Sequence, residues 1–179
     1  MVSKKPIRIA LTGPESTGKS LLCQQLAEHF NEPWVPEYSR EYLSDLRSDY
    51  NFGDILAIAH GQFERELIQL KNAREFLFCD TDFMVTHIWC MVKYGKSHDW
   101  ITNMAAKHPY DYTLLCNIDL PWEFDPLREN PHNREYLLGL YTKELSSRNI
   151  PFSVVEGTGI KRLNNAIKIL EKQGIIPAG

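Results

Sequence analysis

The segment GPESTGKS, residues 13–20, combines glycines, a lysine and a serine at the GxxxxGK[ST] spacing of a phosphate-binding loop. An apolar run at residues 7–11 precedes it and a helical pattern follows, as this loop requires. Glycines let the backbone wrap around phosphate oxygens, while N–H groups and the helix N-terminus supply partial positive charge. Lys19 is expected to reach the β- and γ-phosphates, and Ser20 to hold Mg²⁺. The segment therefore predicts a nucleoside triphosphate site formed by Gly13, Glu15, Ser16, Thr17, Gly18, Lys19, Ser20 and Leu21.

Two acidic residues mark the end of a second apolar run, FLFCD at residues 76–80. The run fits a Walker B strand, so Asp80 is expected to hold Mg²⁺ directly or through water. Asp82, two residues later, is compatible with sharing the metal, positioning a substrate hydroxyl, or capping the next helix. The pattern leaves these three roles open.

Glu37 follows a short apolar segment and precedes a helical pattern. A kinase that acts on a hydroxyl benefits from a carboxylate that orients the attacking oxygen and accepts its proton, and we expect Glu37 to serve in this way. Ribose binding by Glu37 is not separable from this role, and the helix dipole alone also favours an acid here. Arg40, three residues later, is compatible with pairing to Glu37 or contacting a phosphate.

A proline-broken segment, residues 120–134, is expected to form a lid. It carries Arg128 and Arg134, which on a closing lid would offset the charge that develops during phosphoryl transfer and exclude water. Several aromatic residues lie near strand ends, where they are able to stack on a flat ligand. We expect substrate contacts from Glu37, Tyr38, Arg40, Asp80 and Trp122.

The segment GTG at residues 157–159 stands before a basic helix start. Backbone groups around Gly157 would cradle an adenine, with Arg162 against the ring. A glycine turn before an ordinary basic helix explains the same residues equally well.

The elements that must position these residues alternate along the chain. Strand patterns cover residues 7–12, 34–36, 76–79, 112–117 and 151–155, and all but the second are apolar enough for burial on both faces. Helical patterns cover residues 19–30, 39–46, 52–74, 83–94, 100–107, 134–148 and 160–173. This alternation predicts a three-layer α/β fold of the P-loop NTPase and kinase type, with a central, mostly parallel five-stranded sheet between helices. Ligands of such sheets bind beyond the carboxyl ends of the strands, where the polar residues named above gather.

Composition narrows the classes of function. The 179 residues suit a single domain over 1–179, and a net charge of −3 with interspersed signs gives no broad surface for DNA, RNA or anionic membrane. The cysteines Cys23, Cys79, Cys90 and Cys116 show no metal-binding spacing and read as reduced core residues of a cytoplasmic protein. The first residues do not read as a signal peptide, and no apolar run is long enough to span a membrane.

Taken together, the motifs resemble the ribosylnicotinamide kinase domain of NadR-type proteins along nearly the whole chain. The likeness rests on GPESTGKS, on PWVPEYSREYL around Glu37, on CDTDFMVTHIWC around Asp80, and on YDYTLLCNIDLPWEFDPLR with Trp122 and Arg128. The resemblance implies a thymidylate-kinase-like P-loop fold and ATP-dependent phosphorylation of nicotinamide riboside to nicotinamide mononucleotide. The 179 residues contain no helix-turn-helix and no HxGH-type signature, so adenylyl transfer and transcriptional control are not implied.

Chemistry offers separate support for this substrate, because aromatic rings and carboxylates near the strand ends suit a flat cation such as a pyridinium ring. Two other interpretations stay open. One is a kinase for another nucleoside or a nucleoside monophosphate, which would use the same phosphate machinery. The other is a regulatory module that binds ATP with little turnover, although such a module has no need of a hydroxyl-orienting carboxylate.

Overall fold

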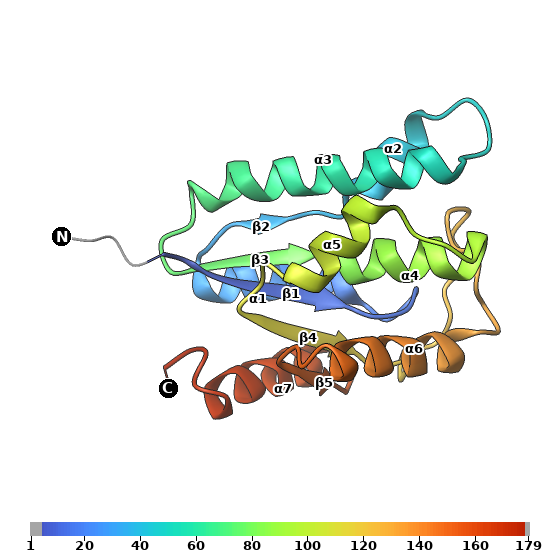
Figure 1. The fold of residues 1–179 in the computed structure, drawn as a ribbon. Helices are drawn as coiled ribbons and strands as arrows, with labels where there is room; N and C mark the ends of the chain where they lie inside the picture. Colours follow the sequence, from blue (N-terminus) through green and yellow to red (C-terminus); the bar gives the residue numbers. More distant parts are fainter. Residues whose placement is uncertain (1–4, 178–179) are drawn as a thin grey trace.

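The computed structural model describes residues 5–177, in which one or two helices follow each strand of a single sheet (Figure 1). The single domain expected over 1–179 includes residues 1–4 and 178–179, which lie outside the described residues. In chain order the elements are β1 (Ile7–Thr12), α1 (Lys19–Phe30), β2 (Trp34–Val35), α2 (Tyr38–Asp45), α3 (Phe52–Leu70), β3 (Phe76–Asp80), α4 (Phe83–Tyr94), α5 (Asp99–Lys107), β4 (Tyr112–Cys116), α6 (Arg134–Ser147), β5 (Phe152–Val155) and α7 (Gly159–Lys172).

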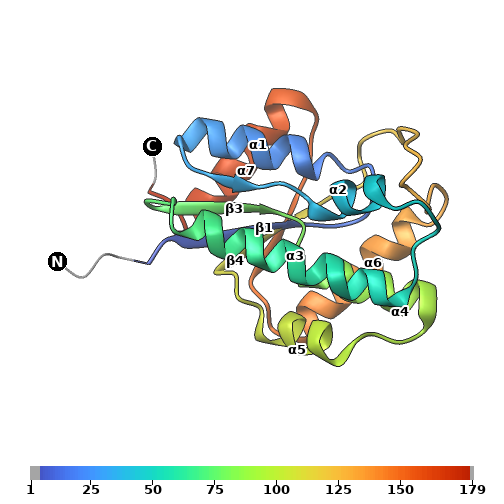
Figure 2. The same cartoon turned by 90° about the horizontal axis from the view of Figure 1, so that it is seen from above.

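The sheet has five strands in the order β2-β3-β1-β4-β5, and every pairing is parallel. Helices α1 and α7 cover one face, while α3, α4, α5 and α6 cover the other (Figure 2). Because all strands run the same way, their carboxyl ends meet at one edge. The loops that follow β1, β2, β3 and β4 therefore converge there.

Alternation along the inner strands divides the core between the two faces. Ile9 and Leu11 of β1 pack with α1 and α7, whereas Ala10 between them packs with the helices opposite. Burial on both faces was expected for β5 as well, but its first three residues are only partly buried or exposed. The cause is topology, since within residues 5–177 β5 is an edge strand that pairs with β4 alone.

Helix α3 ends at Leu70, four residues before the end that its apolar pattern predicts. The backbone N–H of Lys71 donates to the Ile68 carbonyl, which tightens the last turn. Beyond the turn, the Glu32 carboxylate accepts hydrogen bonds from the backbone N–H groups of Arg74 and Glu75, which directly precede β3. Across residues 5–177, none of the helices has the length and apolar character that crossing a membrane demands.

Candidate functional site

The loop between β1 and α1 has the backbone of a phosphate cradle. Gly13 adopts φ 131°, and a Cβ atom there would lie 2.9 Å from the Cys116 carbonyl oxygen. Gly18 adopts φ 72°, a left-handed conformation that costs a glycine little. The Lys19 ammonium donates to the carbonyls of Gly13 at 3.0 Å and Pro14 at 2.7 Å. Lys19 thus curls over its own loop, where phosphate oxygens would replace these weaker acceptors.

A cleft of about 1050 Å³ opens above this loop. Its volume exceeds that of a typical drug-sized site and suits two small ligands side by side. The cleft brings together most of the residues predicted from the sequence: Gly13, Glu15, Ser16, Thr17, Gly18, Lys19, Ser20, Leu21, Glu37, Arg40, Asp80 and Arg128. Tyr38, Asp82, Trp122, Arg134, Gly157 and Arg162 lie outside its lining.

Asp80 closes the floor of the cleft at the end of β3. It is 1% exposed, and neither carboxylate oxygen has a hydrogen-bond partner. Burial, with a contribution from the Glu37 charge, raises the Asp80 pKa to about 6, against the opposing effects of the Ser20 hydroxyl and Lys19. A buried carboxylate without a partner is costly unless a cation joins it.

Asp80 and the Ser20 hydroxyl together fit Mg²⁺, which takes one or two protein ligands and completes its shell with phosphate and water oxygens. Within the described chain, no group of three or more His, Cys, Asp and Glu side chains is arranged to hold a metal unaided. This donor set is therefore suited to a metal that arrives with a nucleotide.

Glu37 lies on the β2 side of the cleft, at the N-terminal end of α2. The Ser39 hydroxyl donates to its Oε1 at 2.8 Å, and the Arg40 Nε lies 3.4 Å from its Oε2. Arg40 also reaches Asp125 of the lid segment at 2.8 Å. These contacts orient the carboxylate and reproduce the Glu37–Arg40 pairing that the spacing suggested.

Asp82 lies outside the cleft lining, in contrast to Asp80. Its Oδ1 accepts the backbone N–H of Val85 at 3.0 Å and the Thr12 hydroxyl at 2.9 Å. Asp82 is thus the N-cap of α4, the third of the roles left open by the sequence. Burial raises its pKa to about 6.

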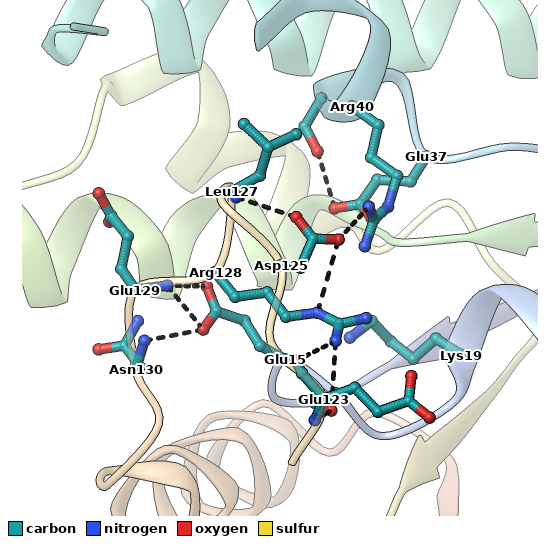
Figure 3. Close-up of polar contacts among 12 residues, drawn as sticks. Glu15, Lys19, Glu37, Arg40, Glu123, Asp125, Leu127, Arg128, Glu129 and Asn130 are labelled. Carbon is teal, nitrogen blue, oxygen red and sulfur yellow. Dashed lines mark hydrogen bonds and ion pairs between the residues drawn. The ribbon is translucent and has the colours of Figure 1, made fainter. Parts of the chain in front are cut away.

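The segment between β4 and α6, the expected lid, lies across the phosphate-binding loop (Figure 3). The Glu15 carboxylate accepts the backbone N–H groups of Glu129 at 3.1 Å and Asn130 at 2.9 Å. Arg128 donates to the Glu123 carbonyl at 2.5 Å, with its guanidinium 3.4 Å from the Ser16 hydroxyl. Lid and loop are therefore joined through Glu15 and Ser16.

Arg134 lies behind the cleft lining, at the first residue of α6. Its guanidinium donates to the Ser16 carbonyl at 3.1 Å and the Leu120 carbonyl at 3.0 Å. It holds the base of the lid to the loop, whereas Arg128 faces the cleft.

Two aromatic residues expected to contact substrate are placed elsewhere. The Tyr38 ring packs on α3, where Gly61 leaves room for it and the Arg65 guanidinium lies 4.4 Å from its centre. The centre of the Trp122 ring lies 6.0 Å from the guanidinium carbon of Arg128 and 5.8 Å from that of Arg134. Each ring supports a neighbouring element of the site from outside the cleft.

Arg162 also departs from its expected place against an adenine ring. It is 3% exposed, and its guanidinium donates to Asp119 Oδ1 at 2.6 Å and to the carbonyls of Gly157 at 2.8 Å, Thr17 at 2.8 Å and Asn117 at 3.2 Å. Through its two terminal nitrogens, Arg162 connects the loops after β1, β4 and β5. The Gly157 N–H donates to Asp119, so Gly157 belongs to the same cluster.

Three cleft residues were not assigned as site residues from the sequence, although Trp34 and Trp89 are among the aromatic residues that were expected to be able to stack on a flat ligand. Asp125 bridges Arg40 and Arg128, and the rings of Trp34 and Trp89 form part of the wall. The PWEFDPLR run contained Asp125 but did not indicate its partner across the cleft. Trp89 lies within a helical apolar pattern, where an aromatic residue is usually part of the core.

Comparison with known proteins agrees with this geometry. A family model described as an AAA domain matches residues 8–162. The trifunctional NAD biosynthesis/regulator protein NadR of Escherichia coli (strain K12) is 30% identical over 156 residues, which are 83% of this chain and 38% of that protein. The chain thus spans well under half the length of this curated relative.

Solved structures share the fold. The NadR protein in complex with NR superposes with a TM-score of 0.81 at 18% identity, over 98% of this chain and 53% of that chain. Its complex with NAD and AMP-PNP gives 0.78 at 18% identity, over 98% and 51%. Thymidylate kinase from Ehrlichia chaffeensis gives 0.63 at 14% identity, over 95% and 100%. The α/β P-loop fold and the likeness to the NadR domain, both expected from the sequence, are confirmed.

Proposed function

We propose that this chain, which belongs to the AAA domain family, is an ATP-dependent kinase that phosphorylates the 5′-hydroxyl of a riboside, namely nicotinamide riboside. One observation carries the proposal. A phosphate-binding loop with Lys19, the unpartnered carboxylate of Asp80 and the oriented carboxylate of Glu37 line the same cleft, whose volume of about 1050 Å³ suits a nucleotide beside a second ligand.

The proposed roles follow from where each group lies. Loop N–H groups and Lys19 would hold the triphosphate, and Ser20 with Asp80 would hold Mg²⁺, whose charge would offset the negative charge of the phosphates. The 5′-oxygen attacks the γ-phosphorus, and the bond from that phosphorus to the β,γ-bridging oxygen breaks, leaving ADP. The hydroxyl proton passes to Glu37, and the riboside gains a 5′-phosphate.

Arg128 is proposed to stabilise charge on the transferring phosphoryl group. In the structure it is held by a carbonyl and lies near the Ser16 hydroxyl, both weak acceptors compared with phosphate. Arg134 and Trp122 support this arginine from behind the cleft. The Asp82 carboxylate caps the N-terminus of α4. We therefore assign Glu37 as the proton acceptor.

Nicotinamide riboside is favoured over neutral nucleosides by the character of the cleft wall. Its pyridinium ring is a flat cation, and the wall offers the aromatic rings of Trp34 and Trp89. The NadR relative whose structure contains NR supports the same choice. AMP-PNP in the second NadR structure supports ATP as the phosphoryl donor.

A substrate panel tests the assignment. With ATP and Mg²⁺ fixed, we expect kcat/KM for nicotinamide riboside to exceed that for thymidine, uridine and thymidine monophosphate by about 10²-fold or more, as is usual when a site built for one set of polar contacts meets another ligand. Comparable values, or a preference for the monophosphate, would assign the chain to another class of nucleoside or nucleotide kinase. ATP binding with no turnover of any acceptor would favour the regulatory interpretation.

A further inference from the structure

The position of Glu37 is set by little backbone pairing. Strand β2 is an edge strand of two residues, and its register partners in the described part of the chain are Phe78 and Cys79 of β3. The ladder ends at Val35, two residues before Glu37. Some other contact must therefore fix where the Glu37 carboxylate enters the cleft.

Gln62 of α3 supplies that contact. Gln62 is 5% exposed. Its Oε1 accepts the Tyr38 N–H at 2.8 Å, and its Nε2 donates to the Asp80 carbonyl at 3.2 Å. The Gln62 side-chain amide thus links Tyr38 to the end of β3 and takes the place of a backbone hydrogen bond between the two segments. The β3 end is itself held to β1, because the Thr81 N–H donates to the Leu11 carbonyl at 3.1 Å.

Gly61, the residue before Gln62, also helps to fix the position of Tyr38. Gly61 lies in the interior of α3, where glycine weakens a helix, so its presence there calls for a reason. A Cβ atom at Gly61 would lie 2.0 Å from the Tyr38 ring. Gly61 therefore admits the ring close to the helix axis, while Gln62 takes the backbone N–H of the same residue.

We propose that Gln62, with Gly61, is a positioning residue for phosphoryl transfer: it fixes Tyr38 and so the distance of Glu37 from the Asp80 end of the cleft. The inference rests on the proposed function, because it assumes that Glu37 accepts the hydroxyl proton. Neither residue lines the main cleft, so their effect is indirect and is expected in the rate of transfer and not in nucleotide affinity.

The test compares Gln62→Met with the wild type and with Gln69→Met, a matched change nearer the C-terminal end of the same helix. We expect Gln62→Met to lower kcat about 10- to 100-fold, the usual cost of a small misplacement of a catalytic group. The Kd for AMP-PNP should stay within about 2-fold, because the phosphate-binding loop is untouched. Gln69→Met should match the wild type in both.

A double-mutant cycle shows whether Gln62 acts through Glu37. In a Glu37→Gln background, the positioning account predicts that Gln62→Met lowers kcat little further. An equal loss in both backgrounds, or an unchanged kcat in the single variant, contradicts the inference while leaving the kinase assignment in place. A wild-type chain that phosphorylates no riboside contradicts the proposed function and this inference with it.

A second variant removes no hydrogen bond. Gly61→Ala should displace the Tyr38 ring and lower kcat with nearly unchanged AMP-PNP affinity. Gly139→Ala in α6, where a Cβ atom meets nothing within 4 Å, is its control and should retain full activity. If Gln62→Met fails to fold, as judged by circular dichroism, full kcat in Gly61→Ala would still overturn the inference.

Discussion

Two aspartates that lie two positions apart are both buried, but their oxygens are paired differently. Both oxygens of Asp80 are unpartnered at the floor of the cleft, whereas Oδ1 of Asp82 accepts two hydrogen bonds at the start of α4 and Oδ2 is unpartnered. A cation would relieve Asp80, while Asp82 already has a structural role. We therefore propose that Asp80 holds the metal, while Asp82 caps α4.

Three isosteric variants separate the acids of the site. Asp80→Asn should raise the Mg²⁺ concentration needed for half-maximal rate and also slow turnover. Glu37→Gln should lower kcat by about 10²–10⁴-fold at saturating Mg²⁺, the range for loss of a general base, with ATP binding nearly unchanged. Asp82→Asn should lower the melting temperature more than kcat. Full kcat in Glu37→Gln combined with a large loss in Asp82→Asn would transfer the base role to Asp82.

The sequence allowed Lys19, Ser20, Asp80 and Glu37 to be predicted because loop spacing and strand ends determine where their backbones lie. Tyr38 could not be placed in the same way. Its direction depends on a gap at Gly61, which is 23 residues further along the chain and becomes adjacent only on folding. Side-chain direction at a strand end is a property of packing, and no local pattern encodes it.

At the scale of elements, the side chains of Glu15 and Ser16 join the phosphate-binding loop to the lid. The Glu15 carboxylate accepts two backbone N–H groups of the lid, from Glu129 and Asn130. Strand and helix patterns predicted both elements, since each is flanked by strong apolar periodicity. The contact between them joins residues more than 100 positions apart and was beyond the reach of such patterns.

Loss of this contact should be visible in amide exchange. Glu15→Ala should speed hydrogen exchange at the Glu129 and Asn130 amides, because both lose their acceptor. Glu123→Ala serves as the control, because it removes another acidic side chain of the cleft. Arg128 is held by the backbone carbonyl of Glu123, which this change keeps, so the two exchange rates should stay unchanged. Unchanged exchange in Glu15→Ala would show that other contacts hold the lid to the loop.

At the scale of the molecule, a buried ion pair links the sheet to the helical layer. Arg8 of β1 pairs with Glu66 of α3, both nearly inaccessible, and the Tyr110 hydroxyl donates to the same carboxylate at 2.8 Å. Burial raises the Glu66 pKa to about 7, against the lowering effect of Arg8. The pair bridges β1, which leads into the phosphate-binding loop, and α3, which carries Gln62.

Breaking this pair should destabilise the fold. Arg8→Met should lower the free energy of unfolding by about 3–5 kcal/mol, because an uncompensated carboxylate stays buried. The loss should be larger at pH 8 than at pH 5: a carboxyl whose folded pKa is raised contributes stability at low pH that disappears as pH rises through that pKa. The double variant Arg8→Met/Glu66→Met should be less destabilised than Arg8→Met alone. Urea denaturation measures each value, and an Arg8→Met variant as stable as the wild type would contradict this account.

We propose above that residues of this cleft transfer the γ-phosphoryl group of ATP to a riboside. The direct measurement is mass spectrometry of a reaction containing the protein, ATP, Mg²⁺ and nicotinamide riboside. We expect ADP and nicotinamide mononucleotide in equal amounts, and a loss of about 10²-fold or more in kcat/KM for a folded Lys19→Ala variant, as for removal of one group that stabilises transition-state charge. ADP without a phosphorylated riboside, or an active Lys19→Ala variant, would contradict the account.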